Sequence, residues 1–293
     1  MIIYNETPLL ELKNQIIEQS GVRVLVKRED LNHPLISGNK WWKLKYNLEE
    51  ALRLQKKMVL TFGGAYSNHI YASAAAAEEL GLKSVGIIRG EETLPLNPTL
   101  SFAKACGMEL LYVSREAYRR KSETEFVTQL HHQFGDFYLI PEGGTNHLAI
   151  KGCAEFGKRL IEEIDFDYVC MPVGTGGTIA GIVEGLNGQK QVIGFSSLKD
   201  GEFLNGEISK YTQFRNWQLN QDYHFGGYAK TTKALLDFAR DFERDFEIPL
   251  DPVYTSKMMF GVFDLMRQGY FKKGSVVLVL HTGGLQGKIV SFG

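Results

Sequence analysis

The stretch Val173-Gly174-Thr175-Gly176-Gly177-Thr178 joins a strand-like run over 168–171 to a helix-like run that begins near Thr178. Glycines at such a turn let the backbone approach a ligand closely, and the free N–H groups of the helix start attract an anion. A lone Gly-x-Gly-Gly turn also fits an ordinary strand-to-helix connection. The loop lacks both the lysine-serine ending of a triphosphate loop and an acidic ribose partner, so the pattern favours a monophosphate over ATP or a dinucleotide.

The same alternation of short β-branched runs and longer helical patterns continues along the chain. It is typical of an α/β fold, in which helices connect the parallel strands of a sheet. Strands are expected at 22–27, 58–62, 84–88, 109–113, 138–140, 168–171, 192–195 and 275–280. Helices are expected to begin near Lys40, Ser67, Pro98, Glu116, Asn146, Thr178, Thr231 and Ser256.

The composition favours a small-molecule substrate. The chain has 293 residues, 44% of them hydrophobic, which is enough for one large core or two moderate ones. Its 33 lysines and arginines nearly balance 34 acidic residues, so we expect neither nucleic acid nor an anionic membrane as a partner. Apolar runs fall short of the roughly 20 residues of a membrane span.

The first residues and the cysteines of the chain suggest a cytoplasmic protein. The first residues lack the basic and apolar regions of a secretory leader, so we expect no processing. The three cysteines, Cys106, Cys153 and Cys170, are widely spaced. This pattern predicts neither a disulfide framework nor a metal site, and it suits a reducing compartment.

Lys40 is the first candidate catalytic residue. It follows a Gly38-Asn39 turn at the start of a predicted amphipathic helix, and Lys43 lies about one helical turn further on. A lysine is ordinarily a solvated surface residue. A neighbouring cation shifts its amine toward the neutral, nucleophilic form, and two such lysines can serve an aldehyde and a phosphate. Together with the glycine loop and the polar turn Ser67-Asn68-His69, the two lysines predict a site for pyridoxal 5'-phosphate.

Further candidate site residues lie just after predicted turns or just after a predicted strand. Thr282 lies two residues after the strand predicted at 275–280, where α/β proteins place their ligands, and is a candidate partner for a ring nitrogen. The alternative is a simple turn that ends the last strand. Tyr228 and Tyr254 follow turn-forming residues, although most tyrosines are packed rings with a satisfied hydroxyl.

The order of these motifs resembles that of the family of 1-aminocyclopropane-1-carboxylate deaminase and D-cysteine desulfhydrase. The matching stretches cover nearly the whole chain and are Gly38-Asn39-Lys40 with Lys43, Ser67-Asn68-His69, Pro141–Asn146, Gly174–Thr178, Asp251–Tyr254 and His281–Gly284. The family belongs to the tryptophan-synthase-β type (fold type II) of pyridoxal phosphate enzymes. The resemblance implies two α/β lobes with the cofactor between them and a homodimer. Residues 1–43 with 151–293 would form the larger lobe, and 44–150 the smaller inserted one.

The resemblance also implies a role for each site residue. Lys40 would bind the cofactor covalently, while Lys43 and the backbone of Gly174, Thr175, Gly176, Gly177 and Thr178 would hold its phosphate. Asn68 would bind the ring hydroxyl oxygen and Thr282 the pyridine nitrogen. Ser67 would bind the substrate carboxylate, and Tyr228 and Tyr254 would face the substrate.

Departures from the family pattern bear on the substrate. Deaminases of the cyclopropane amino acid typically have glutamate and glutamine at the positions of Thr255 and His69. The resemblance therefore favours a lyase or hydrolase that eliminates sulfide from D-cysteine, giving pyruvate and ammonia. The cyclopropane deaminase is the alternative, and a cofactor-binding protein without turnover is a third, against which the retained Lys40, Ser67 and Tyr254 argue. Trp41 and Trp42 replace a small or hydroxyl residue and an arginine between the two lysines.

Overall fold

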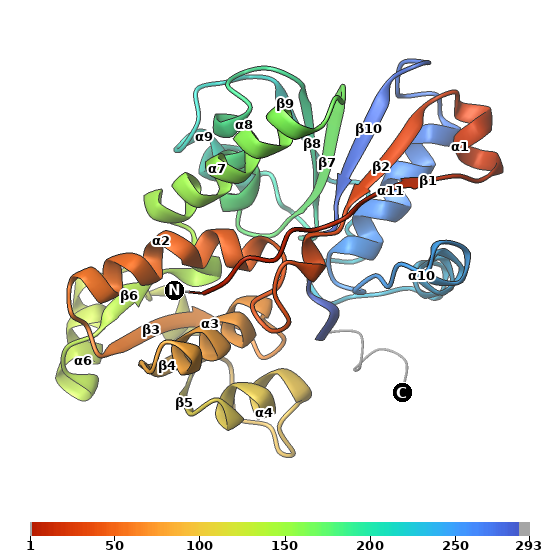
Figure 1. Cartoon of the computed structure of the whole chain (residues 1–293). Coiled ribbons are helices and arrows are strands. Elements are labelled where there is room, and N and C mark those ends of the chain that lie inside the picture. The colour runs from red at the N-terminus through yellow and green to blue at the C-terminus, as the bar shows by residue number, and fades with distance from the viewer. Residues whose placement is uncertain (1, 287–293) are drawn as a thin grey trace.

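The computed structural model describes residues 2–286 and contains two sheets (Figure 1). The larger has the strand order β1-β2-β10-β7-β8-β9, and the smaller has the order β5-β4-β3-β6. The larger sheet is built from β1 (Leu9–Leu12), β2 (Arg23–Lys27), β7 (Tyr168–Val173), β8 (Gln191–Ser196), β9 (Trp217–Asn220) and β10 (Val276–Leu280). The smaller is built from β3 (Met58–Gly63), β4 (Lys83–Arg89), β5 (Met108–Val113) and β6 (Tyr138–Ile140).

Helices connect most of these strands and cover both faces of each sheet. The α-helices are α1 (Gln15–Ser20), α2 (Asn39–Arg53), α3 (Asn68–Glu79), α4 (Pro98–Ala105), α5 (Arg115–Arg119), α6 (Thr124–Phe134), α7 (His147–Glu163), α8 (Gly177–Gly185), α9 (Phe203–Ser209), α10 (Lys233–Phe246) and α11 (Thr255–Arg267). Short 3-10 turns cover Glu29–Leu31 and Glu142–Gly144. No helix in this described part of the chain has the length and apolar character needed to cross a bilayer.

The larger sheet is parallel apart from β1, and its side chains alternate between two cores. Val24 and Val26 of β2 pack with the helices α1, α10 and α11, whereas Leu25 packs on the opposite face with α7 and α8. β10 repeats the pattern, since Val277 and Val279 belong to the first core and Leu278 to the second. Because both faces are buried, these strands are continuous apolar runs.

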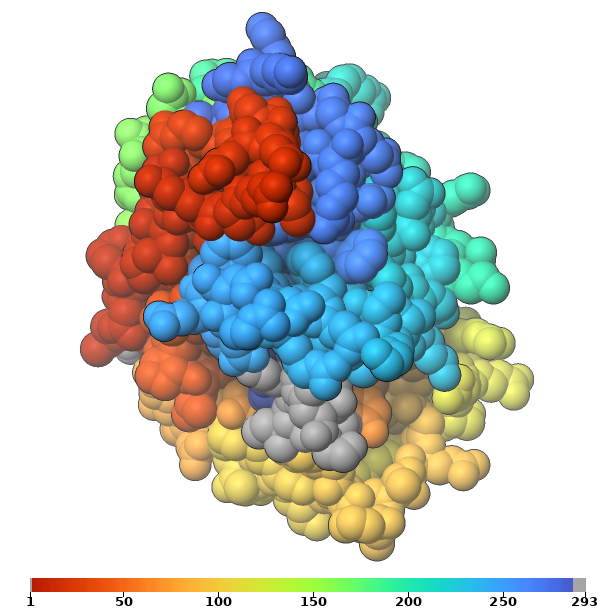
Figure 2. Space-filling model, turned by 90° about the vertical axis from the view of Figure 1, so that its right-hand side faces the viewer, coloured from red at the N-terminus to blue at the C-terminus, as the bar shows by residue number. Residues whose placement is uncertain are grey.

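The smaller sheet is parallel throughout and lies below the larger one in Figure 1. Helices α2, α3 and α4 pack on one of its faces, and α5 and α6 on the other. Figure 2 shows the same division on the surface, where the red and blue residues around the larger sheet lie above the orange and yellow residues of the smaller one.

Helix α2 begins at the end of the larger sheet and runs along the smaller one. Gly38, just before the helix, has a φ of 69°, and a Cβ there would lie 1.9 Å from the carbonyl oxygen of Thr282. The N–H of Asn39 donates to that same oxygen at 3.3 Å. Only glycine allows this contact, because any side chain would collide with the end of β10.

The structure confirms the α/β class with parallel sheets flanked by helices. Each of the eight expected strands is present, and each expected helix start lies within two residues of an observed one. The edge strands β1 and β9 and the helices α1, α6 and α9 were not expected. The strands of the smaller sheet all lie within 44–150, and the exact division into lobes stays a prediction.

Candidate active site

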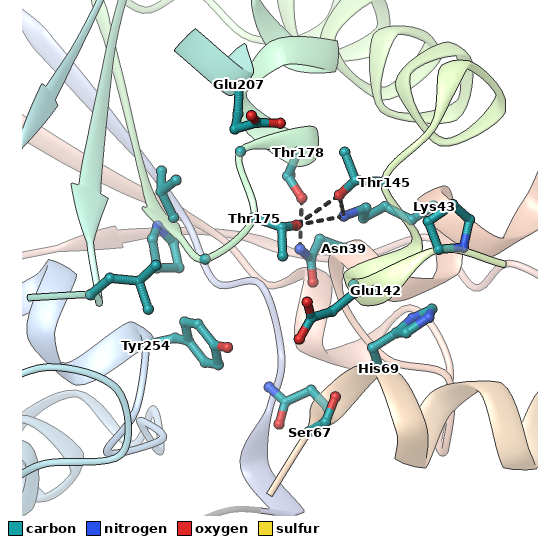
Figure 3. A pocket seen from close by; sticks show the side chains of 18 of the residues that line it. Asn39, Lys43, Ser67, His69, Glu142, Thr145, Thr175, Thr178, Glu207 and Tyr254 are labelled. Carbon is teal, nitrogen blue, oxygen red and sulfur yellow. Dashed lines mark hydrogen bonds between the residues drawn. The ribbon is translucent and has the colours of Figure 1, made fainter. Parts of the chain in front are cut away.

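A cavity of about 530 Å³ lies where the carboxyl ends of strands from both sheets meet (Figure 3). Strands β3, β4, β6, β7 and β10 all end there, which is where open α/β sheets bind ligands. The structure places nearly every predicted site residue in its wall: Lys40, Lys43, Ser67, Asn68, Gly174, Thr175, Gly176, Thr178, Tyr228, Tyr254 and Thr282. The exception is Gly177, the first residue of α8, which does not line the cavity.

One end of the cavity gathers hydroxyl and amine groups around the glycine loop (Figure 3). Lys43 Nζ donates to Thr145 Oγ1 at 2.9 Å and to Thr175 Oγ1 at 3.4 Å, and the two threonine hydroxyls lie 2.7 Å apart. A Cβ added at Gly177 would lie 2.7 Å from Thr145 Oγ1 and 3.1 Å from Lys43 Nζ. Because Gly177 has no side chain, the backbone, the two hydroxyls and the amine can all approach one small region. Such a cluster of donors suits a phosphate.

The start of α2 holds Lys40 beside this end. Asn39 Nδ2 donates to Thr178 Oγ1 at 2.7 Å, which ties the first residue of α2 to the first turn of α8. Lys40 Nζ in turn donates to Asn39 Oδ1 at 3.0 Å.

Burial makes both amines unusually easy to deprotonate. It lowers the pKa of Lys40 to about 8. The pKa of Lys43 falls to about 7, first through burial and then through the positive charge of Lys40. A nucleophilic lysine needs this shift, because only the neutral amine attacks a carbonyl carbon.

The helical period separates the lysines from the two tryptophans. Trp41 and Trp42 are buried away from the cavity, and the Trp42 ring stacks on Phe156 with centroids 5.0 Å apart. Trp42 Nε1 also donates to Glu29 Oε2 at 2.7 Å. The tryptophan pair thus packs α2 against α7 and lies on a different face from the two amines.

The start of α3 presents a second set of polar groups. Ser67 caps the helix, and its Oγ accepts from the N–H of Ile70 at 3.3 Å. Asn68 follows as the first helical residue, and Gln286 Nε2 donates to its Oδ1 at 2.5 Å. The unpaired N–H groups of this first turn suit a carboxylate.

His69 is buried and held as a neutral ring. The Thr61 hydroxyl donates to the carbonyl of Ile140 at 2.8 Å, so its oxygen accepts from His69 Nε2 at 2.7 Å. This assigns the proton to Nε2 and leaves Nδ1 as an acceptor. Burial, followed by the charges of Lys40 and Lys43, lowers the pKa of His69 well below its ordinary value.

Tyr228 and Tyr254 meet at the opposite wall, with ring centroids 6.1 Å apart. Burial raises the pKa of Tyr228 to about 12 and that of Tyr254 well above its ordinary value. Both phenols are therefore protonated at neutral pH. Asp251 fixes the turn before α11 by accepting from the N–H of Tyr254 at 2.9 Å.

Thr282 lies at the end of β10, where the preceding residue is firmly held. His281 Nε2 donates to the carbonyl of Pro249 at 2.7 Å, and His281 Nδ1 lies 3.2 Å from Asp30 Oδ1. Thr282 lines the cavity. Thr255 is absent from the wall, because its hydroxyl is bound to Asp251.

Several residues of the wall were not assigned a role from the sequence: Asn39, His69, Arg89, Lys121, Glu142, Thr145, Phe203, Glu207 and Tyr211. A signal existed for Arg89, because it is the last residue of a parallel strand, just as Thr282 follows one. Thr145 had a weaker signal in the Pro141–Asn146 motif. Its contact with Lys43, 102 residues away, depends on the tertiary fold.

The fold and the site define a two-sheet α/β cofactor enzyme with a lysine and a phosphate cradle. Residues 2–283 match the model of the pyridoxal-phosphate dependent enzyme family, and the chain belongs to that family. A Pyrococcus furiosus protein with the provisional name 1-aminocyclopropane-1-carboxylate deaminase is 31% identical over 98% of this chain and 94% of its own. The bifunctional D-cysteine desulfhydrase/1-aminocyclopropane-1-carboxylate deaminase of Arabidopsis thaliana is 30% identical over 92% and 74%.

A solved structure agrees with these sequence matches. The crystal structure of an ACC deaminase homologue has a TM-score of 0.86 and 31% identity, covering 98% of this chain and 92% of that one. The chain is thus a pyridoxal-phosphate-dependent enzyme, as the motifs predicted. The residues present fit the cofactor, since the glycine cradle, the clustered hydroxyls and the two low-pKa amines match a phosphate and an aldehyde.

Proposed function

We propose that this enzyme deaminates a small amino acid by β-elimination, with D-cysteine as the substrate that fits best and sulfide, pyruvate and ammonia as products. The observation that carries the proposal is the meeting of Lys40, the phosphate cradle, Ser67 and Tyr254 in one cavity. Pyridoxal phosphate bound there would withdraw electrons from the substrate α-carbon. We further propose a cytoplasmic homodimer, and the site roles below belong to the same proposal.

Two ends of the cavity would orient the substrate. Lys43, Thr145 and Thr175 would hold the phosphate, and the amine of Lys40 would bind the cofactor until the substrate takes its place. Ser67 and the first N–H groups of α3 would bind the substrate carboxylate. This arrangement would bring the substrate α-carbon within reach of Lys40.

The proton transfers follow from the pKa values. The Lys40 amine, with a pKa of about 8, would accept the α-proton, because a base titrating near neutral pH is efficient in both directions. The neutral His69 ring would act only as a hydrogen-bond acceptor at Nδ1. Tyr254, protonated at neutral pH, would donate a hydrogen bond or a proton to the departing sulfur.

The ranking of D-cysteine above 1-aminocyclopropane-1-carboxylate rests on the residue that would face the pyridine nitrogen of the cofactor. Thr282 lines the cavity and would supply a neutral hydroxyl, and the position after Tyr254 holds Thr255, which is bound to Asp251. A neutral partner stabilises the ring nitrogen in its charged form less than a carboxylate does. Opening the cyclopropane ring, whose substituted carbon has no proton to remove, depends more on that stabilisation than elimination of sulfide does.

The test is a direct comparison. Pyruvate and sulfide release from D-cysteine and L-cysteine would be measured beside 2-oxobutanoate release from 1-aminocyclopropane-1-carboxylate. We expect D-cysteine to be turned over faster than the other two. Equal or faster 2-oxobutanoate production would make the cyclopropane deaminase the better assignment; the names of the relatives include both activities.

A further inference from the structure

Arg89 introduces a positive charge into the cavity wall that the proposed chemistry does not use. It is the last residue of β4, and its guanidinium carbon lies 5.7 Å from the centre of the Tyr118 ring. A Cβ added at Gly64 would lie 3.6 Å from Arg89 Nη2. The guanidinium therefore lies near both Tyr118 and the β3–α3 loop, which ends at Ser67.

The acidic residues of the cavity wall already have partners. Glu142 accepts from the Tyr118 hydroxyl at 2.8 Å and pairs with Lys121 at 3.2 Å. Glu207 pairs with Lys210 at 2.6 Å. Within residues 2–286, the Arg89 side chain forms no hydrogen bond or ion pair, so its guanidinium is free to bind an anion that enters the cavity.

The position of this charge points to the substrate side chain. The Tyr228 hydroxyl donates to the carbonyl of Tyr66 at 3.3 Å, in the same β3–α3 loop that Arg89 approaches. Arg89 also exerts its charge on that hydroxyl. Tyr228 is one of the two tyrosines expected to face the substrate, whereas the α-carboxylate would be bound by the start of α3. A planar guanidinium with five donors suits a phosphate, sulfate or sulfonate group.

We propose that Arg89 extends the β-elimination beyond D-cysteine to amino acids that carry an oxyanion group on the β-carbon, such as O-phosphoserine or serine O-sulfate, and makes the enzyme prefer them to substrates of similar size without that charge. This inference rests on the β-elimination proposed above. The α-proton passes to the enzyme, the bond between the β-carbon and oxygen breaks, and phosphate or sulfate leaves with the electron pair. Water then replaces the amino nitrogen, giving pyruvate and ammonia.

The experiment compares three forms of the holoenzyme: wild type, Arg89→Gln and the control Lys83→Gln. Lys83 is an exposed cation at the other end of β4, outside the cavity. Pyruvate release is measured from both enantiomers of O-phosphoserine and from 3-chloroalanine, whose leaving group is uncharged before it departs. We expect Arg89→Gln to lower kcat/KM for O-phosphoserine at least tenfold and for 3-chloroalanine less than twofold, with no change in Lys83→Gln.

Salt and binding measurements complete the test. Because Arg89 is exposed, the preference should shrink as ionic strength rises. Equal losses for both substrates would overturn the inference and assign Arg89 to the α-carboxylate, and no loss would overturn it as well. Calorimetry with O-phosphoserine and serine detects the preference without turnover. Arg89-dependent binding in the absence of pyruvate release would therefore uphold this inference while refuting the proposed elimination.

Discussion

The hydroxyl of Thr255 donates to Asp251 Oδ1 at 2.7 Å, and the Thr255 oxygen accepts from the N–H of Asp251 at 2.8 Å. Both residues are fully buried, and Tyr254 between them points into the cavity. The residue after the tyrosine thus shapes the turn that presents the phenol.

Removing this hydroxyl should weaken the turn. Thr255→Val leaves the Asp251 carboxylate without one donor and its N–H without an acceptor, so we expect the free energy of unfolding to fall by about 1–3 kcal/mol. Thr255→Ser keeps the hydroxyl and should lose less. Denaturant unfolding monitored by circular dichroism measures both changes, and equal stability of the two variants would argue against the role assigned to this hydrogen bond.

Lys40 should carry the cofactor. Borohydride reduction of the holoenzyme followed by peptide mapping is expected to place the pyridoxyl label on Lys40, because its amine is poised beside the phosphate cradle with a pKa of about 8. In Lys40→Ala the label should disappear although Lys43 is still present. A label on Lys43 in the wild-type protein would reverse the roles of the two amines.

Lys43 should make the stability of the cofactor-free protein depend on pH. Its pKa is about 7 in the folded state and near its ordinary value of 10.5 in the unfolded state. Between these values the unfolded chain binds more protons, so stability rises with pH, by up to about 1.4 kcal/mol per pH unit for one proton. Lys43→Met should flatten this rise between pH 7 and pH 9. Parallel curves for the two proteins would show that the Lys43 pKa is not lowered.

The phosphate cradle should not tolerate a methyl group at Gly177. The added Cβ would lie 2.7 Å from Thr145 Oγ1 and displace the hydroxyls that Lys43 holds. We expect Gly177→Ala to weaken cofactor binding more than tenfold, or about 1.4 kcal/mol. Gly206→Ala is the matched control, because a Cβ there meets nothing within 4 Å. Cofactor titration by absorbance compares them, and equal affinities would place the phosphate elsewhere.

Lys257 should hold the turn that carries Tyr228. Its buried ammonium donates to the carbonyls of His224 at 2.8 Å and Gly227 at 2.7 Å. Lys257→Met removes both bonds, so amide exchange over 224–228 should become faster while the sheet cores stay protected. Lys233→Met, a change on the exposed face of α10, serves as the control. Unchanged amide exchange over 224–228 in Lys257→Met would show that this turn is stable without the two Lys257 hydrogen bonds.

The sequence was most informative where both faces of an element are buried. The central strands were found because burial on both sides makes them continuous apolar runs. β1 and β9 are edge strands with polar or exposed positions, and their short sequences, LLEL and WQLN, resemble loops.

The site residues also differ in whether the sequence could predict them. The lysines and the glycine loop are local motifs and could be read directly from the chain. In the cluster of Lys43, Thr145 and Thr175, the lysine contacts threonines that are more than 100 positions away in the sequence, so only the packed fold reveals it. The position of the free Arg89 guanidinium depends in the same way on Tyr118 and Gly64.

The tryptophans on the face of α2 opposite the two lysines provide an intrinsic fluorescence signal for cofactor binding. Two of the enzyme's three tryptophans, Trp41 and Trp42, lie on the same helix as the two site lysines, and the third, Trp217, lies on β9. Their near-ultraviolet emission overlaps the absorption of a bound pyridoxal ring. Loading of the site will therefore quench the intrinsic fluorescence, which allows cofactor occupancy to be followed in real time in every variant described above, including those without turnover.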